Sequence, residues 1–283
     1  MILVDLSQIM ISTLMMQLKG KTADLDIDLL RHMVLNVLRS HRQKFKSKFG
    51  ELVICCDSTN VWRKDEFPYY KAHRKTDRDA SPLNWDKFFK QMNQVRDELQ
   101  EFFPYKVIQV PRAEADDIIA VIVKMRHGKE DILILSGDKD FQQLQCYEDV
   151  YQYSPVLKKF INCDNPDLYL EEHILRGDPG DGVPNVLSAD TVFIDRGRQT
   201  PMTTARIKKF LDAPDPTKEM STAILRNYTR NRTMVDLNCI PAYISNAIEE
   251  QFNNPPGAKD RTQLFNYFID RKLKNLMDAI GDF

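Results

Sequence analysis

Short apolar runs alternate with longer stretches of helical spacing over the first half of the chain. The runs predict buried strands at 2–4, 52–56, 105–110 and 131–135, and a weaker one at 150–153. Apolar residues at helical spacing predict helices at 9–18, 24–45 and 86–102, and a further helix begins at 113. Strands that are apolar throughout, alternating with helices, indicate a parallel sheet covered on both faces.

The second half of the chain has mostly helical patterning. Helices are predicted at 168–176, 187–194, 202–211, 218–229, 242–252 and 261–280, with a Pro- and Gly-containing loop at 253–258. We therefore expect an α/β fold, with a mostly parallel central sheet flanked by helices and a helical C-terminal part. The expected division places a core in residues 1–182 and the helical part in 183–283.

Carboxylates follow the predicted strands. Asp5, Asp57, Asp138 and Asp140 come after three strands, and Glu114, Asp116 and Asp117 open the helix that follows a fourth. One such residue alone is usually a helix cap. Because the carboxyl ends of parallel strands meet at one edge of a sheet, the repetition indicates a shared site.

A cluster of carboxylates needs cations. Two like charges about 4 Å apart repel by roughly 4 kcal/mol at an effective dielectric near 20. Ligands that are all oxygens favour Mg²⁺ or Mn²⁺. The sequence therefore predicts a metal-dependent phosphodiesterase.

The segment 61–83 mixes basic and aromatic residues without a clear apolar stripe. Positive charge binds phosphates and rings stack on bases, so this composition favours single-stranded nucleic acid. A solvated loop is the alternative, because acidic residues dilute the charge. The candidate nucleic-acid-binding residues here are Arg63, Lys64, Tyr70, Lys71, Arg74 and Lys75.

A Gly- and Pro-rich turn spans 177–185, between two predicted helices. Gly180 and Gly182 would let backbone N–H groups approach a phosphate closely. A plain turn between helices explains the same residues. Asp181 is an eighth carboxylate for the proposed site if this turn faces the end of the sheet.

Charge and composition are compatible with these predictions. The net charge of the 283 residues is −1, but residues 196–283 carry 14 basic against 10 acidic side chains. No apolar run is long enough for a membrane span, and no signal peptide is evident. Five cysteines without metal-site spacing suit a reducing cytoplasm.

With these residues placed, the sequence resembles the flap-endonuclease family of structure-specific 5′ nucleases, and within it the RNase H type of T-even bacteriophages. The resemblance runs over nearly the whole chain. It is carried by the stretches 4–9, 62–74, 114–117, 138–141 and 177–181.

The resemblance implies roles for these residues. It implies two Mg²⁺ ions, replaceable by Mn²⁺, with Asp5, Asp57, Glu114 and Asp116 around the first, Asp138, Asp140 and Asp181 around the second, and Asp117 and Asp178 further out. Asp116 would lie between the ions. The segment 61–83 would form a helical arch in which Lys71 and Arg74 touch the scissile phosphate and Tyr70 stacks on a base.

The resemblance also makes the turn part of a helix-turn-helix that grips duplex DNA, often with a monovalent cation near Gly177–Asn185. Gly182 stands where the family usually has Asn, and Asn185 where it usually has Gly. Asn tolerates left-handed backbone better than most residues, so the turn itself can persist.

The implied activity is 5′ to 3′ exonuclease and flap endonuclease cleavage of duplex DNA and RNA·DNA hybrids, with removal of RNA primers in phage replication. The expected setting is the host cytoplasm, as a monomer. A single-strand-binding protein and a sliding clamp are candidate partners, but the sequence does not indicate which of them, if either, recruits the enzyme. The alternatives are a PIN-type ribonuclease, a non-catalytic protein that binds DNA structures and, more weakly, a phosphorylated receiver-like switch.

Overall fold

The computed structural model describes residues 1–18, 26–257 and 262–283. Contacts divide the chain into two compact units. The first comprises Met1–Thr59, Pro82–Asn162 and Ala242–Phe283, and the second Asn60–Ser81 and Cys163–Pro241. These units gather segments that are distant in the chain, whereas the division expected at residue 182 follows chain order and stays a prediction.

Among the described residues, the first unit contains a six-stranded sheet with the order β3-β2-β1-β4-β5-β6. Strands β1 to β5 pair in parallel, and β6 pairs antiparallel to β5. The strands are β1 Ile2–Asp5, β2 Leu52–Cys55, β3 Lys106–Ile108, β4 Ile132–Leu135, β5 Val150–Ser154 and β6 Lys159–Ile161. The mostly parallel sheet is thus confirmed, and β6 adds an edge that the apolar pattern did not predict.

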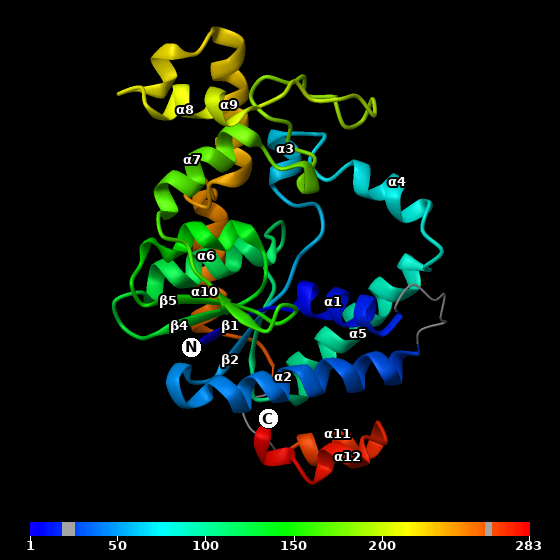
Figure 1. Cartoon of the computed structure of the whole chain (residues 1–283). Coiled ribbons are helices and arrows are strands. Elements are labelled where there is room, and N and C mark those ends of the chain that lie inside the picture. The colour runs from blue at the N-terminus through cyan, green and yellow to red at the C-terminus, as the bar shows by residue number, and fades with distance from the viewer. Residues whose placement is uncertain (19–25, 258–261) are drawn as a thin grey trace. The chain divides into compact units, whose positions relative to one another are not determined.

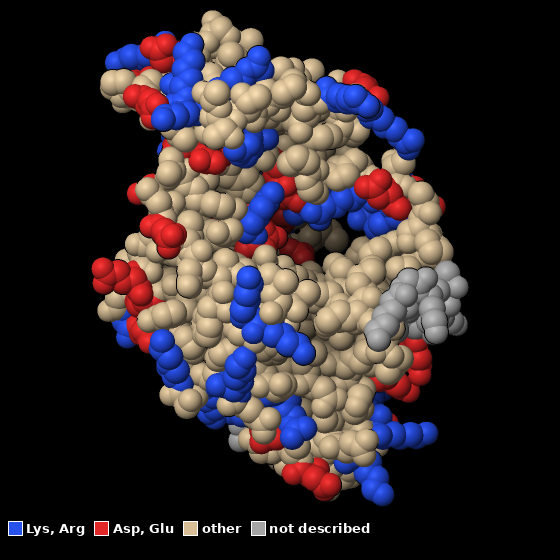
Figure 2. Space-filling view, viewed as in Figure 1, with Lys and Arg blue, Asp and Glu red and all other residues tan. Residues whose placement is uncertain are grey.

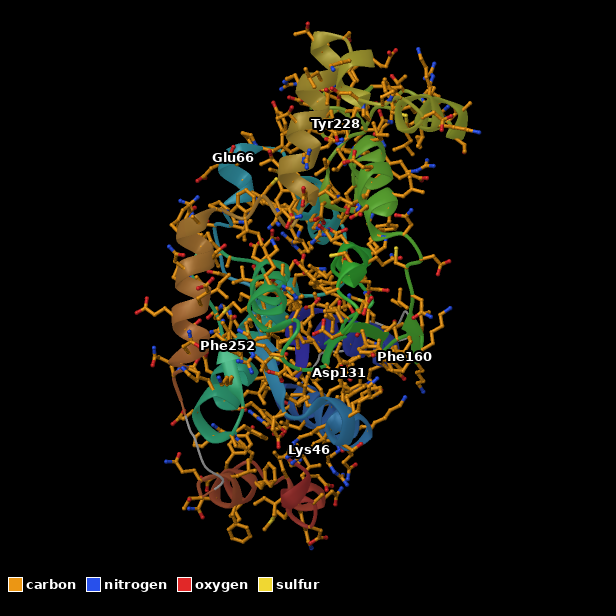
Figure 3. The ribbon with its side chains drawn as sticks, turned by 90° about the vertical axis from the view of Figure 1, so that its left-hand side faces the viewer. Lys46, Glu66, Asp131, Phe160, Tyr228 and Phe252 are labelled. Atoms are coloured by element: carbon orange, nitrogen blue, oxygen red, sulfur yellow. The ribbon has the colours of Figure 1, made fainter. Side chains whose placement is uncertain are left out.

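Helices cover both faces of this sheet, as the continuous apolar strands require. On one face lie α6 (Ala115–Arg126) and α10 (Ala242–Asn253); on the other lie α2 (Ile27–Phe49) and α5 (Trp85–Phe102), with α1 (Leu6–Leu18) beside α2 (Figure 1). Lys106 connects β3 to α10, because its Nζ donates to the Phe252 carbonyl at 3.0 Å and lies 4.1 Å from the Phe252 ring. Figure 3 labels Phe252 at the end of α10.

The core follows from the alternation of side chains along each strand. Ile2 and Val4 of β1 point into one cluster with Leu38 of α2 and Leu99 of α5. Each such side chain contributes roughly 1.5–3 kcal/mol when fully buried. The same cluster takes in residues of α11 (Leu264–Asp270), of α12 (Lys274–Met277) and near the 3₁₀ helix η4 (Ile280–Asp282). Because the strands are buried on both faces, their order and register are well defined. The residues at the carboxyl ends of the strands therefore have defined positions along one edge of the sheet.

The second unit is helical. Its α-helices are α3 Arg63–Glu66, α4 His73–Asp79, α7 Pro166–Arg176, α8 Thr204–Leu211 and α9 Thr222–Val235, and its 3₁₀ helices are η2 Pro179–Asp181 and η3 Pro216–Glu219. Helix α7 packs against α8 and α9, and α3 packs against α9. Val61, Phe67 and Tyr70 join Met234 and Val235 in one apolar cluster, so the segment 60–81 shares a core with α9.

Three predicted helices differ from the structure. Residues 187–194 form turns instead of a helix, because Asn185 Oδ1 accepts from the Leu187 N–H and the Ser188 hydroxyl and so competes with helical bonding. The helix predicted at 218–229 begins later, since Ser221 caps α9. The one predicted at 261–280 breaks near Lys272, whose φ is 54°.

The beginnings of the predictions at 24–45 and 261–280, and the end of the loop at 253–258, lie outside the described residues. Within the described part of the chain, every helix is too short or too polar to cross a membrane.

Candidate metal centre and nucleic-acid interface

The end of β1 places a carboxylate in the protein interior. Asp5 is 6% exposed. Its Oδ1 accepts from the Gln8 N–H at 3.0 Å, and its Oδ2 accepts from the Ser136 hydroxyl at 3.2 Å. Because β1 lies between β2 and β4, Asp5 is at the centre of the edge where the strands end.

The neighbouring strands contribute two more carboxylates. Asp57 follows β2, and its Oδ1 accepts at 2.8 Å from the N–H of Ala115, the first residue of α6. Asp138 follows β4 and caps the 3₁₀ helix η1 (Lys139–Cys146) by accepting from the Asp140 N–H at 3.0 Å. The sheet thus brings Asp5, Asp57 and Asp138 to one edge, as predicted.

The negative charges of Asp57 and Asp138 act electrostatically on the buried Asp5 carboxylate. Burial, then the negative charge of Asp57 and, to a lesser degree, that of Asp138 raise the pKa of Asp5 to about 7. A divalent cation would offset this repulsion, and the donors are the oxygens that Mg²⁺ and Mn²⁺ prefer. The residues at this edge therefore fit a divalent metal.

The acidic start of α6 has a structural role as well. The Asp117 carboxylate is buried, and its Oδ2 accepts from the Glu114 N–H at 2.9 Å, which forms a capping box. Glu114 is itself buried, whereas Asp116 is half-buried. Acidic residues in a first turn also favour the positive end of the helix dipole. Asp117 thus fixes the start of the helix that carries Asp116.

Sequence reasoning missed the side chains that support these carboxylates. Ser136 contacts Asp5 and also accepts from the Asp138 N–H at 3.1 Å. Gln152, 1% exposed within β5, donates to the carbonyls of Ser136 and Asp138. The available signal was a single glutamine inside a buried strand, which needs hydrogen-bond partners there.

The segment 60–81 contains the short helices α3 and α4, and several of its side chains are buried. Trp62, Phe67 and Tyr70 are 2–3% exposed, and Phe67 and Tyr70 belong to the apolar cluster shared with α9. Arg63 is also buried, and its Nε donates to the Met234 carbonyl at 3.0 Å. The apolar residues were concealed because the basic residues between them obscure any helical period. The predicted roles of Arg63 and Tyr70 on nucleic acid stay predictions.

The candidate catalytic residues Lys71 and Arg74 meet Asp181 in the second unit. Lys71 Nζ lies 3.4 Å from Asp181 Oδ2, and Arg74 Nη2 donates to Asp181 Oδ1. The Tyr70 hydroxyl donates to Asp181 Oδ2 at 2.9 Å. The Lys71 N–H also donates to the Asp181 carbonyl at 2.7 Å, with Lys71 in left-handed backbone at φ 55°. The Asp181 carboxylate therefore contacts three side chains of the segment 60–81.

The turn that contains Asp181 is tightly folded. Asp178 is buried, accepts from the Gly180 N–H at 2.9 Å and lies 3.6 Å from His173 Nε2. Gly182 has φ 73°, and a Cβ there would lie 3.0 Å from His73 Nδ1. Glycine at 182 therefore suits both the left-handed backbone and the approach of His73.

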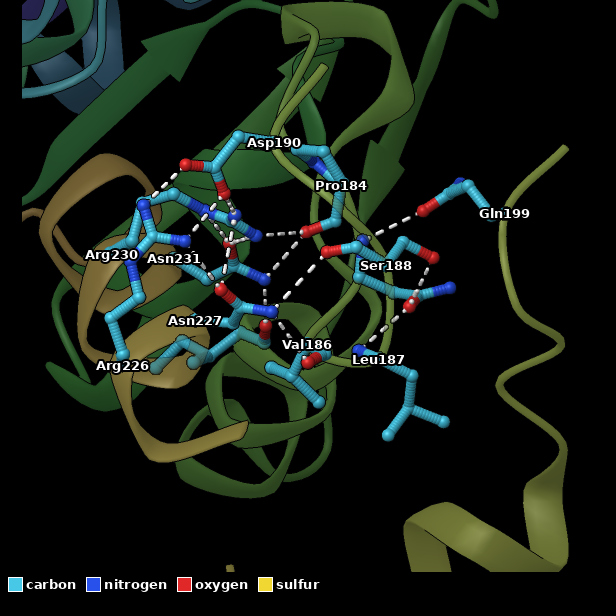
Figure 4. A network of polar contacts seen from close by, with 12 residues as sticks. Pro184, Val186, Leu187, Ser188, Asp190, Gln199, Arg226, Asn227, Arg230 and Asn231 are labelled. Atoms are coloured by element: carbon cyan, nitrogen blue, oxygen red, sulfur yellow. Dashed lines mark hydrogen bonds and ion pairs between the residues drawn. The ribbon is translucent and has the colours of Figure 1, made fainter. Parts of the chain in front are cut away.

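A network of hydrogen bonds and ion pairs connects the end of the turn, at Pro184, to α9 (Figure 4). Asn231, fully buried on α9, donates to the carbonyls of Ile174 and Pro184 at 2.8 Å. Arg230 pairs with Asp190 and donates to the Pro184 carbonyl at 2.9 Å. These contacts hold the chain after the turn in an irregular conformation, so the expected helix-turn-helix lacks a second helix at 187–194 among the described residues.

The remaining candidates are dispersed. Lys64 and Lys75 are exposed, as binding to phosphate requires, and Gly180 is exposed in η2. Asn185 is 4% exposed; its side chain donates to the Thr200 carbonyl and accepts from the Leu187 N–H, both after the turn. On the face shown in Figure 2, basic side chains are spread over the surface and interrupted by acidic ones.

Both halves of the chain match protein families. A model described as the 5′-3′ exonuclease, N-terminal resolvase-like domain, matches residues 5–171, and one described as T4 RNase H, C terminal, matches residues 164–283. The ribonuclease H of Enterobacteria phage T4 is 32% identical over 294 residues, which cover 99% of this chain and 95% of that protein.

Solved structures share the fold. A protein of phage T5 co-crystallised with metal ions has a TM-score of 0.62 at 16% identity, covering 89% of this chain and 97% of that one. The flap endonuclease of bacteriophage T5, in a pseudo-enzyme–product complex with DNA and metal ions, has a TM-score of 0.62 at 17% identity, covering 89% and 96%.

Proposed function

Because the chain belongs to the family of 5′-3′ exonucleases that includes the ribonuclease H of phage T4, it is a 5′ nuclease, and we propose that it cuts phosphodiesters at a two-metal centre. The proposed ligands and their nearest supports are Asp5, Asp57, Glu114, Asp116, Asp117, Asp138, Asp140, Asp178 and Asp181. The observation that supports this most strongly is the meeting of Asp5, Asp57 and Asp138 at one edge of the sheet, with the pKa of Asp5 raised.

Two Mg²⁺ ions, or Mn²⁺ in their place, would supply an activated water and would stabilise the leaving oxygen. The protein residues position this chemistry. Ser136 and Gln8 fix the Asp5 carboxylate, and the capping box fixes the helix start from which Asp116 projects. The oxygen of water forms a new P–O bond as one ester P–O bond breaks; the water would lose a proton to solvent, and the leaving oxygen would take one up as a hydroxyl. No protein nucleophile is required.

Lys71 and Arg74 would bind the scissile phosphate. A phosphodiester gains negative charge on its way to the transition state, so two cations there stabilise that state more than the ground state. Their contacts with the Asp181 carboxylate show that both side chains can reach an anion from this part of the chain.

We propose duplex DNA, 5′ flaps and RNA·DNA hybrids as substrates, with RNA primers as the natural target. The T5 relative in complex with DNA and the T4 relative named ribonuclease H support this choice. In the proposed setting the enzyme is a monomer in the host cytoplasm, recruited by a single-strand-binding protein or a sliding clamp. Cross-linking in extracts of infected cells tests that recruitment.

A cleavage assay tests the function. A 5′-labelled flap, a nicked duplex and an RNA·DNA hybrid are incubated with Mg²⁺, with Mn²⁺ and with EDTA. We expect short 5′ products in either metal and none in EDTA. A non-catalytic DNA-binding protein would bind the flap and leave it uncut in every metal.

A matched pair of variants locates the activity. Asp116→Asn removes a proposed ligand, whereas Asp131→Asn removes a carboxylate just before β4, at the opposite end of that strand (Figure 3). The Asp131 carboxylate pairs with Lys48 at the surface, at 3.8 Å, and the contact of its backbone carbonyl with the N-terminal ammonium is kept in the variant. Loss of cleavage in the first variant alone supports the proposed centre, and equal losses in both contradict it.

A further inference from the structure

Three backbone carbonyls in the first part of the turn, those of Asp178, Gly180 and Asp181, already have N–H donors. The Asp178 carbonyl accepts from the N–H groups of Asp181 and Val183, at 3.1 and 2.8 Å. The Gly180 carbonyl accepts from Arg74 Nε at 3.1 Å, and the Asp181 carbonyl from the Lys71 N–H at 2.7 Å. A cation would have to displace these donors before it could bind the same oxygens.

Side chains of α9 donate hydrogen bonds to backbone carbonyls between Pro184 and Ser188. The Pro184 carbonyl accepts two hydrogen bonds, from Arg230 Nη2 at 2.9 Å and from Asn231 Nδ2 at 2.8 Å (Figure 4). Since a carbonyl oxygen has two lone pairs, this one is fully used. Asn227 Nδ2 donates to the carbonyls of Val186 and Ser188 at 3.0 and 3.2 Å.

One of these donors carries a permanent positive charge inside the protein. The Arg230 side chain is 7% exposed and pairs with Asp190. A second cation at the Pro184 carbonyl would be repelled by the guanidinium, and repulsion is strong where water is excluded. The donor set therefore does not fit the monovalent cation expected near Gly177–Asn185.

We propose that Arg230 and Asn231 order this turn in place of a monovalent cation, and that they are positioning residues for binding of duplex DNA. The duplex as ligand rests on the proposed function. The organisation of the turn by α9 rests only on the contacts within the second unit. The two parts are tested by separate measurements.

The binding measurement uses a labelled nicked duplex in EDTA, with KCl, NaCl or tetramethylammonium chloride at one ionic strength. We expect dissociation constants that agree within about twofold, and a tighter K⁺ value by about tenfold would overturn the inference. If the duplex does not bind in any of the salts, the proposed substrate is wrong. The inference about the turn is then still tested by the melting temperature of the protein in the same salts. The melting temperature should not differ between the salts, and a rise specific to K⁺ would overturn the inference.

A matched pair of arginines on α9 provides the variants. Arg230→Gln removes the buried charge at the Pro184 carbonyl, whereas Arg232→Gln removes a half-exposed arginine that pairs with Asp236 at 3.4 Å. We expect Arg230→Gln to weaken duplex binding by about tenfold and Arg232→Gln by about twofold or less. Equal effects would contradict a positioning role for Arg230.

A direct measurement does not depend on the variants. Crystals of the unaltered protein soaked in a rubidium salt should show no anomalous peak among the carbonyls of 178–188. A rubidium peak bound to these oxygens would overturn the inference.

Discussion

Replacement of Asp181 by Asn separates two roles for this carboxylate. In the structure it accepts from the Tyr70 hydroxyl and pairs with Lys71 and Arg74. If these contacts anchor the segment 60–81, Asp181→Asn should loosen that segment in protein free of metal and DNA. If Asp181 serves only as a metal ligand, the same change should leave the segment unaltered in EDTA.

The contacts set the size of the effect. A hydrogen bond to a charged group contributes about 1.5–3 kcal/mol. The Arg74 side chain is 43% exposed and that of Lys71 20%, so solvent weakens these two ion pairs toward the 0.2–1 kcal/mol typical of surface pairs. Asparagine keeps one acceptor oxygen and so retains part of these contributions. We expect a total loss of about 1–2 kcal/mol, which raises the population of the opened segment roughly 5- to 30-fold.

Hydrogen exchange measures this opening residue by residue. The Lys71 amide is the probe, because it donates to the Asp181 carbonyl, which the substitution keeps. Its exchange rate in EDTA should rise with the population of the open state. Asp77→Asn, the same charge change at an exposed position of α4, is the control. An unchanged Lys71 rate in Asp181→Asn, or an equal rise in the control, would refute the anchoring role.

Four further outcomes are expected. Asp116→Asn should lower flap cleavage by orders of magnitude while gel-shift affinity stays near that of the unaltered protein; near-normal turnover at low Mg²⁺ would rule out a bridging role. Lys71→Ala should slow single-turnover cleavage at least about 100-fold, near 2.7 kcal/mol, whereas Lys75→Ala should chiefly raise the dissociation constant; small and equal effects would indicate a solvated loop. Mg²⁺ at 100 times its dissociation constant should add roughly 2.7 kcal/mol per site to unfolding free energy, visible as a higher melting temperature than in Na⁺ of matched ionic strength. The pKa of Asp5 is raised from 3.8 to about 7, so its proton stabilises the metal-free fold at low pH, and this contribution is lost as pH rises from about 4 to 7. Asp5→Asn should therefore flatten the pH dependence of denaturant unfolding in EDTA. An unchanged profile would contradict the raised pKa.

Much of the first unit could be predicted from the sequence because its signals are local. Continuous apolar strands such as 132–135 are buried on both faces, and the aspartates at or just after the ends of β1, β2 and β4 fall at the shared edge. The carboxylate positions follow from chain order and from parallel pairing alone. Gln152 was missed because its importance depends on Ser136, a residue that only the folded sheet brings beside it.

The second unit was harder to predict because its order depends on contacts distant in sequence. Phe67 and Tyr70 resemble exposed rings until α9, more than 150 residues later, provides Met234 as their partner. Residues 187–194 have an ordinary helical apolar pattern but form no helix. The Asn185 side chain accepts from the Leu187 N–H, and Asp190 pairs with Arg230 of α9. Side-chain hydrogen bonds of this kind leave no periodic trace.

The position of α10 has a consequence for synthesis. Helix α6, buried along 118–123, packs against α10, which begins 116 residues after α6 ends. At ribosomal speeds of 5–20 residues per second, the interval between the two helices is on the order of ten seconds. During that interval the sheet face that carries α6 lacks the second of its two helices. A chain that stops before residue 242 would therefore leave apolar surface of α6 open to chaperones and proteases.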